Sequence, residues 1–112
     1  MLELYKLYKL SRQYSDAGNY TQAEYALLYM IRLKTELLGR NYAGCSFDLY
    51  SLGLINTALN KYDRARRFLI RALQIQKSHK EMSRLINVSQ TLQMLAGLRR
   101  EKQANYFVAE AA

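Results

Sequence analysis

The sequence contains an internal repeat of 42 residues, and no other feature constrains its fold as strongly. Residues 7–30, LYKLSRQYSDAGNYTQAEYALLYM, align without a gap with residues 49–72, LYSLGLINTALNKYDRARRFLIRA. A weaker third copy, LAGLRREKQANYFVAEAA, requires an offset of 44 and places Gly97, Tyr106 and Ala109 at corresponding positions. A fixed period of roughly 20–50 residues is typical of arrays in which each repeat is one supersecondary unit.

Each copy predicts two helices joined by a short turn. The first helix carries apolar and small residues at spacings of three and four, which place them on one face: Leu4, Leu7, Leu10, Ser11 and Tyr14. A break follows at residues 16–19, where Gly18 can adopt a positive φ without steric cost. Asn19 or Thr21 is expected to cap the second helix, which continues to about Leu38 and ends at Gly39.

The second copy repeats this arrangement, with predicted helices at 43–59 and 62–78 around a turn at residues 60 and 61. A fifth helix is expected over 81–102, and a sixth begins near Asn105. The absence of proline, together with many Leu, Ala, Gln, Lys and Arg residues, favours helix throughout. The sequence therefore predicts one all-α domain over residues 1–112, with repeats at about 2–40 and 43–80 and a partial repeat at about 81–112.

Small and aromatic residues recur where the helices are expected to pack. Ser11, Gly53 and Gly97 occupy the same small position in the three copies, which would let two helices approach closely. A glycine inside a helix costs about 1 kcal/mol relative to alanine. We therefore expect close contact at Gly53 to offset that cost. The predicted packing residues, with the tyrosines filling the wedge at the turn, are Ser11, Tyr20, Ala23, Gly53, Tyr62 and Ala65.

The pattern L-x2-L-[SG]-x2-[YN]-x3-[GN]-x-Y-x2-A-x3-L-x2-[MA] resembles the tetratricopeptide repeat. The long form, with ELLG at 36–39 closing the second helix, is similar to the repeats of kinesin light chains and their bacterial relatives. The chain departs from the pattern in lacking the proline that often ends the second helix, and in carrying Asn56 where tyrosine is common. HEAT repeats have a similar period and are the structural alternative, although they lack the Tyr-x2-Ala pairing.

This resemblance implies a right-handed superhelix of antiparallel helical hairpins, a solenoid of about two and a half repeats. It also implies a non-enzymatic scaffold that binds a peptide or protein partner in a concave groove lined by the first helix of each hairpin. The groove residues that it implies are Tyr5, Tyr8, Arg12 and Ser15 in the first repeat and Phe47, Tyr50, Leu54 and Thr57 in the second. The alternative for these aromatic residues is that they pack between repeats.

Signs of catalysis, a metal site or a cofactor site are missing from the sequence. His79 is the only histidine, and its place at a predicted helix end suits a favourable interaction with the helix dipole. Cys45 is the only cysteine, so the chain forms no internal disulfide. The acidic residues are scattered singly, and no phosphate-binding glycine loop is present. We therefore expect no enzymatic activity and no cofactor.

The net charge of +8 is concentrated in the second half of the chain. Residues 1–58 carry six basic and five acidic groups, whereas residues 59–102 carry eleven basic and three acidic groups. Arg64, Arg67 and Arg71 share one face of the predicted fourth helix. This face is either a solvated outer surface or a basic patch for an acidic partner. An alternative function is therefore a basic module that binds nucleic acid or another polyanion through residues 59–102.

No apolar run approaches the ~20 residues that span a bilayer, and the N-terminus lacks the apolar core of a secretory signal. The sequence therefore predicts a soluble, cytoplasmic protein. The final residues are too apolar for the polar capping helix that usually ends a repeat array, and the predicted fifth helix carries Leu85, Ile86, Leu92, Leu95 and Leu98. We expect either a homo-oligomer or a fragment of a longer array.

Overall fold

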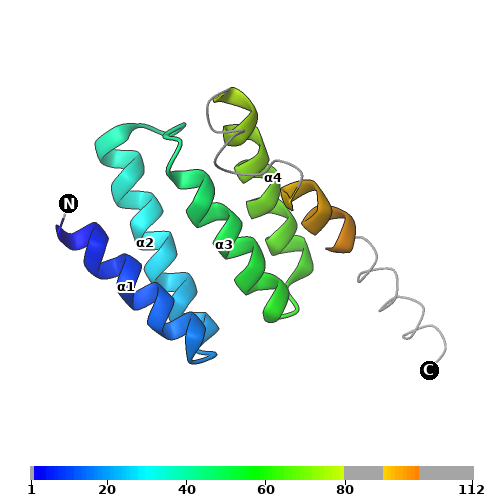
Figure 1. Ribbon diagram of the computed structural model, residues 1–112, viewed down its shortest axis with the longest axis horizontal. Coiled ribbons are helices and arrows are strands. Elements are labelled where there is room, and N and C mark those ends of the chain that lie inside the picture. The colour runs from blue at the N-terminus through cyan, green and yellow to red at the C-terminus, as the bar shows by residue number, and fades with distance from the viewer. Residues whose placement is uncertain (1, 80–89, 99–112) are drawn as a thin grey trace.

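The computed structural model describes residues 2–79 and 90–98, and every regular element in these ranges is a helix. The helices are α1 (Leu2–Asp16), α2 (Tyr20–Leu38), α3 (Cys45–Ala58) and α4 (Tyr62–Ser78), followed by a helical segment at 90–98 (Figure 1). Each of the four helices packs against the next along the chain. The all-helical class predicted from the periodicity is confirmed for the described residues.

The predicted helix bounds are close to the observed ones. The ends of α2 and α4 fall where the sequence placed them, whereas α3 begins two residues later than expected. The delay arises because residues 39–45 form a turn in which the Tyr42 amide donates to the Gly39 carbonyl and the Cys45 amide to the Tyr42 carbonyl. Only residues 90–98 of the predicted fifth helix are described, and the predicted sixth helix, with Tyr106 and Ala109, lies outside the described residues.

The turns inside the two hairpins have the same geometry, 42 residues apart. After α1, the Asn19 amide donates to the Tyr14 carbonyl and the Gly18 amide to the Ser15 carbonyl, with Gly18 at φ 77°. These two bonds with a left-handed residue define a Schellman motif, which satisfies carbonyls that the helix end leaves open. The predicted helix stop at Gly18 is confirmed.

Asn60 takes the place of Gly18 in the second hairpin. Its φ is 61°, and asparagine is among the few non-glycine residues that adopt this conformation readily. The Lys61 amide donates to the Asn56 carbonyl and the Asn60 amide to the Thr57 carbonyl, which completes a second Schellman motif. The two turns are therefore equivalent in backbone geometry as well as in sequence position.

The expected side-chain cap of α2 is not formed. Asn19 occupies the N-cap position, but its side chain makes no capping hydrogen bond to a described residue, and neither does Lys61 at the equivalent position before α4. The Asn19 carbonyl accepts from the Ala23 amide and the Lys61 carbonyl from the Ala65 amide, which are the first backbone hydrogen bonds of the two helices. The prediction of a capping side chain was wrong, because Asn19 has φ −84° and ψ 68° instead of the β-region backbone typical of a capping residue, and Thr21 lies inside α2.

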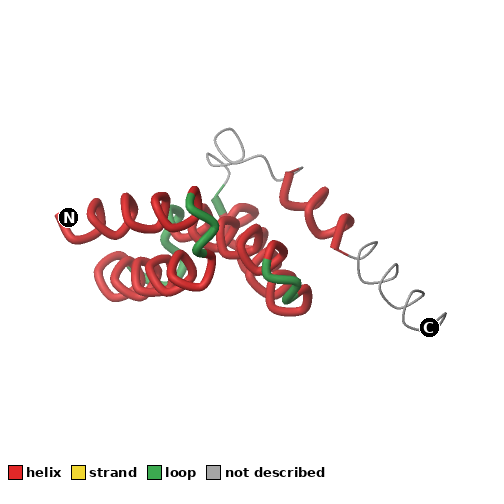
Figure 2. Tube along the Cα trace, turned by 90° about the horizontal axis from the view of Figure 1, so that it is seen from below, coloured by secondary structure: helices red, strands yellow, loops and turns green. Residues whose placement is uncertain are grey.

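The main core is formed by buried side chains of α2, α3 and α4, and partly buried residues of α1 pack against it. Its fully or nearly fully buried side chains are Ala23, Leu27, Met30, Cys45, Leu49, Leu52, Ile55, Ala72 and Ile75. Figure 2 shows that the helix beginning at the N-terminus and the helix that follows it lie in two layers. Small residues are buried in both hairpins: Ala23 of α2 and Ala65 of α4 are completely buried, and Ser11 is the one buried residue of α1.

Glycine at position 53 is required by the packing of α3 on α4. A Cβ built there would lie 2.5 Å from the Cγ and Cδ2 atoms of Leu69, closer than real carbon atoms approach. Gly97 differs, because no described residue places an atom within 4 Å of a Cβ at that position. The close approach expected at Gly53 is confirmed, whereas the one expected at Gly97 involves the predicted helix with Ala109, which lies outside the described residues.

Candidate functional site

The predicted groove residues lie on α1 and α3, the first helices of the two hairpins. Tyr5, Tyr8 and Arg12 of α1 are exposed, as are Phe47 and Leu54 of α3. Tyr8 and Phe47 each expose 49% of their surface, which is high for aromatic side chains. Exposed apolar patches on a folded domain often mark a binding surface.

Tyr50 differs from the other groove residues because it is half-buried. It packs against a second small core formed by Ala65, Leu69 and Leu98. The alternative prediction was that these aromatic residues pack between repeats. Tyr50 fits that prediction in part, because one portion of its side chain is buried and the rest is exposed. Its removal would disturb the contact between α4 and the segment 90–98 as well as the surface.

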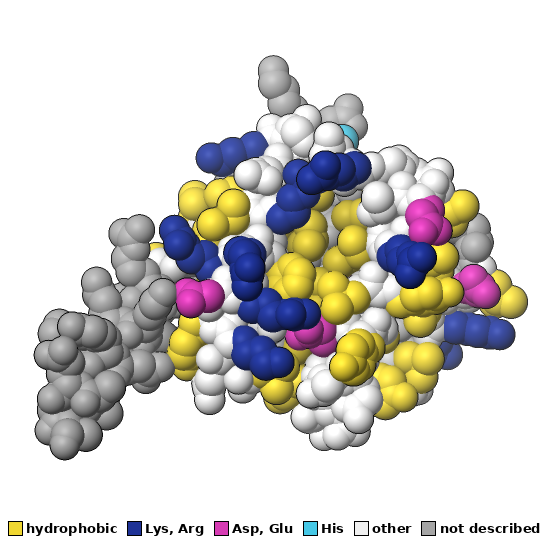
Figure 3. Space-filling model, turned by 180° about the vertical axis from the view of Figure 1, so that it is seen from behind, with side chains coloured by type: hydrophobic (Ala, Val, Ile, Leu, Met, Phe, Trp, Pro, Cys, Tyr) yellow, Lys and Arg dark blue, Asp and Glu magenta, His cyan; other side chains and the backbone are white. Residues whose placement is uncertain are grey.

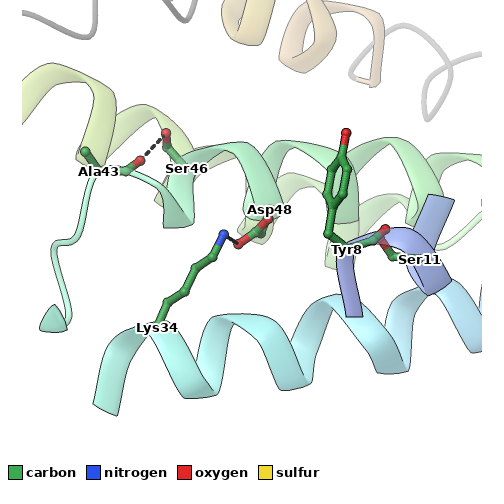
Figure 4. A network of polar contacts seen from close by, with 6 residues as sticks. All are labelled: Tyr8, Ser11, Lys34, Ala43, Ser46 and Asp48. Carbon is green, nitrogen blue, oxygen red and sulfur yellow. Dashed lines mark hydrogen bonds and ion pairs between the residues drawn. The ribbon is translucent and has the colours of Figure 1, made fainter. Parts of the chain in front are cut away.

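The α1 part of the surface is held in place by local contacts. The Ser11 hydroxyl donates to the Tyr8 carbonyl at 2.8 Å, and the Tyr8 ring points away from α2 (Figure 4). The Lys9 ammonium lies 5.3 Å from the centroid of the Tyr5 ring, within the range of a cation–π interaction. Lys9 was missed in the sequence, although the spacing of four residues from Tyr5 is the signal that brings two side chains together on a helix. With Arg12, it makes this end of the surface basic.

A buried ion pair joins α2 to α3. The Lys34 Nζ lies 2.7 Å from the Asp48 Oδ2, and the two side chains are only 17% and 8% exposed (Figure 4). Burial raises the pKa of the Asp48 carboxyl above its ordinary value, and the hydrogen bond and positive charge of Lys34 oppose that rise. The attraction of Lys34 therefore offsets part of the cost of burying the Asp48 carboxylate between the two hairpins.

A similar link with neutral groups joins α4 to the segment 90–98. The Thr91 hydroxyl donates to the Gln76 Oε1 at 3.1 Å, and both residues are buried. Gln76 lies 42 residues after Lys34, and Thr91 lies 43 residues after Asp48. Leu98 packs on Ala65 and Leu69, the residues equivalent to Ala23 and Leu27 of the main core. The segment 90–98 therefore packs on α4 much as α3 packs on α2.

Cys45 is at the start of α3, beside the Lys34–Asp48 ion pair, and is 1% exposed. Burial raises the pKa of the Cys45 thiol, followed in importance by a hydrogen bond with Thr35 that lowers it. A buried thiol that stays protonated is a poor nucleophile, because the thiolate is the reactive form.

We therefore expect Cys45 in the folded protein to react with Ellman's reagent at pH 8 at least about tenfold more slowly than in 6 M urea. The thiolate fraction falls about tenfold for each unit by which the pKa rises, and burial also slows access of the reagent. The release of the coloured thiolate, followed over time, measures both rates. The urea sample is the control for intrinsic thiol reactivity. Equal rates would mean that Cys45 is accessible.

The predicted basic face of α4 is largely occupied by contacts with the first hairpin. Arg64 forms an ion pair with the buried Glu24 of α2, and its guanidinium lies 5.5 Å from the Phe68 ring centroid. Arg71 donates to the Asn41 side-chain oxygen at 2.8 Å and to the Arg40 carbonyl at 3.3 Å. The interpretation of three arginines as one open patch was therefore incomplete, because α2 and its following loop supply partners for two of them.

Arg67, the remaining arginine of that set, is exposed. It lines a shallow depression at the start of α4 together with Arg64 and residues 60–63. His79 follows the end of α4, where its Nε2 lies 2.8 Å from the Asn41 carbonyl oxygen. Since a carbonyl oxygen only accepts, Nε2 is the donor and carries a proton. Arg71 and His79, which lie about two helical turns apart, therefore both bind the loop that contains Asn41.

Within residues 2–79 and 90–98 there is no cluster of three or more His, Cys, Asp or Glu side chains suited to a metal ion. None of the described helices is both long enough and apolar enough to cross a membrane. Comparison of the chain with protein-family models and with curated proteins yields no match. The arguments for function therefore rest on the surface itself.

Proposed function

We propose that the chain is a tetratricopeptide-type repeat protein that acts as a non-enzymatic scaffold, holding a peptide or protein partner on the surface formed by α1 and α3. The observation that carries the proposal is the exposure of Tyr5, Tyr8 and Phe47 on the first helices of consecutive hairpins. Tyrosine offers a rigid apolar face and a hydroxyl at low entropic cost, which suits recognition of a partner.

The repeat supports this proposal through its geometry. Two hairpins share the same Schellman turn and the same buried alanine after it, so their first helices present equivalent positions to solvent. Tyr5 and Phe47 are one such pair of exposed aromatic residues, whereas Tyr8 is exposed and its counterpart Tyr50 is half-buried. A partner lying across both helices would meet aromatic groups at a regular spacing, with Lys9 and Arg12 favouring acidic groups at the α1 end.

The double variant Tyr8→Ala/Phe47→Ala is expected to weaken partner binding by about thirtyfold or more, because aromatic anchors at interface centres typically contribute about 2 kcal/mol or more. These two residues are preferable to Tyr50, whose removal would also disturb packing. Partners captured from cell extract on the immobilised wild-type chain are identified by mass spectrometry, and their affinities are then measured by calorimetry with each purified variant.

The matched control is Tyr25→Ala/Tyr29→Ala, which removes two exposed tyrosines from α2 instead. It is expected to leave the affinity for such a partner within about twofold (about 0.4 kcal/mol at 1.4 kcal/mol per tenfold change), and circular dichroism checks that both variants keep their helix content. Unchanged affinity in Tyr8→Ala/Phe47→Ala with intact helicity would exclude this surface as the binding site.

A further inference from the structure

The outer surface of α2 and α4 presents tyrosines in the first hairpin and arginines at the same positions in the second. Tyr25 and Tyr29 lie one helical turn apart on α2 and expose 69% and 48% of their surfaces. Arg67 and Arg71 follow them by 42 residues and lie one turn apart on α4. Because the two hairpins are equivalent, these four side chains occupy matching places on neighbouring helices.

A side-chain ion pair joins α4 to α2. The Arg64 guanidinium pairs with Glu24, the residue before Tyr25, and covers Phe68. Phe68 in turn packs against the main core. α3 packs against both α2 and α4, and the Arg64–Glu24 pair bridges α2 and α4 directly, so we treat the tyrosine pair and the arginine pair as two parts of one outer surface. This outer surface, with Tyr25 and Tyr29 on α2 and Arg67 and Arg71 on α4, is distinct from the surface on α1 and α3.

This surface carries more positive than negative charge. Arg32 and Arg67 are exposed, and Arg71 is half-buried. Of the acidic groups nearby, Glu24 is buried under Arg64, Glu36 is paired with Arg32, and Asp63 lies beside Arg67 at the start of α4. Figure 3 shows Lys and Arg side chains gathered on one half of the face opposite to that of Figure 1, next to exposed hydrophobic side chains.

We propose that this outer surface binds single-stranded nucleic acid, with successive bases stacked on Tyr25 and Tyr29 and the phosphates held by Arg67. Residues four apart on a helix are separated by roughly 6 Å along the axis, a spacing that two splayed bases can span. Single-strand binding sites combine a basic surface with aromatic rings in this way, and the stacking tolerates any base sequence.

An acidic protein segment is the less favoured occupant because it would use the arginines without the tyrosine rings. If a polyanion is held by charge alone, its affinity falls when an arginine is removed and does not change when a neutral ring is removed. A stacked base responds to both, and it retains its contact when tyrosine is replaced by phenylalanine. The identity of the occupant can therefore be read from how tyrosine and arginine variants differ.

The test uses the full chain and a fluorescein-labelled twelve-residue oligouridine, with binding followed by fluorescence anisotropy at 50 and 200 mM salt. Tyr25→Ala/Tyr29→Ala is expected to weaken binding by about thirtyfold or more, since each stacked base contributes about 1–3 kcal/mol. Tyr25→Phe/Tyr29→Phe should bind within threefold of the wild type (about 0.7 kcal/mol at 1.4 kcal/mol per tenfold change). Arg67→Gln should lower the slope of log affinity against log salt by about one.

The matched control, Tyr8→Ala/Phe47→Ala, is expected to retain RNA binding, which separates this proposal from the proposed function on α1 and α3. Three results would overturn it: no binding at 50 mM salt, loss of binding with Arg67→Gln but not with the tyrosine-to-alanine variant, or equal competition by a twelve-residue polyglutamate. Circular dichroism establishes that each variant is folded.

Discussion

Replacing Lys34 with methionine is expected to lower the free energy of unfolding at pH 7 by about 3 kcal/mol, because it strands the buried carboxylate of Asp48. Methionine keeps most of the apolar stem of lysine and removes the ammonium. The Asp48 side chain is 8% exposed, so water compensates little for the lost partner. Urea denaturation followed by circular dichroism measures the change.

The pH dependence of this variant provides a sharper test. The folded state raises the pKa of Asp48 above its ordinary value near 3.8, so it binds that proton more tightly than the unfolded chain does. The stability linked to Asp48 is therefore greatest below pH 3.8, and it is lost as the pH rises through the folded pKa. Both influences that lower this pKa come from Lys34, so its removal raises the pKa further and extends the loss to higher pH.

The stability difference between wild type and Lys34→Met should consequently be larger at pH 7 than at pH 4. The double variant Lys34→Met/Asp48→Asn removes the titrating group and should show no added loss between these values. Arg32→Met is the surface control, because the Arg32–Glu36 pair is mostly exposed and such pairs contribute about 0.5 kcal/mol or less. A difference that stays constant with pH would show that Asp48 is not destabilised by losing Lys34.

Local sequence patterns were sufficient to predict the helices and their turns. The spacing of apolar residues on each helix depends only on neighbours within about two turns, and Gly18 signals its own left-handed conformation. The close approach at Gly53 was also predictable, because a glycine inside a helix is otherwise unfavourable. The facing helix expected at Gly97, with Ala109, lies outside the described residues, so close approach there stays a prediction.

Contacts between helices were not predictable, since they depend on the register of one helix against another. Lys34 and Asp48 are 14 residues apart, and nothing in either local sequence marks them as partners. Arg64 and Arg71 share a helix face with Arg67, but the structure separates them because α2 places Glu24 beside Arg64 and its following loop places Asn41 beside Arg71. Exposure of Tyr25 and Tyr29 likewise follows from which face of α2 its neighbours leave uncovered.

The substitution Gly53→Ala should lower the free energy of unfolding by about 2 kcal/mol, even though alanine is the better helix former by about 1 kcal/mol. The added methyl group would meet Leu69 at 2.5 Å, and Leu69 is completely buried, so it has little room to move. The cost of forcing apart α3 and α4 therefore exceeds the helical gain.

A double-variant cycle with Leu69→Ala identifies the cause of this loss. Truncating Leu69 alone leaves a cavity and should cost about 2–5 kcal/mol. In that background the methyl group at position 53 enters vacated space, so Gly53→Ala should become neutral or stabilising, with a coupling of about 1–3 kcal/mol. Equal effects of Gly53→Ala with and without Leu69 would mean that the penalty does not come from this contact, and the close packing of α3 on α4 would then not explain the glycine.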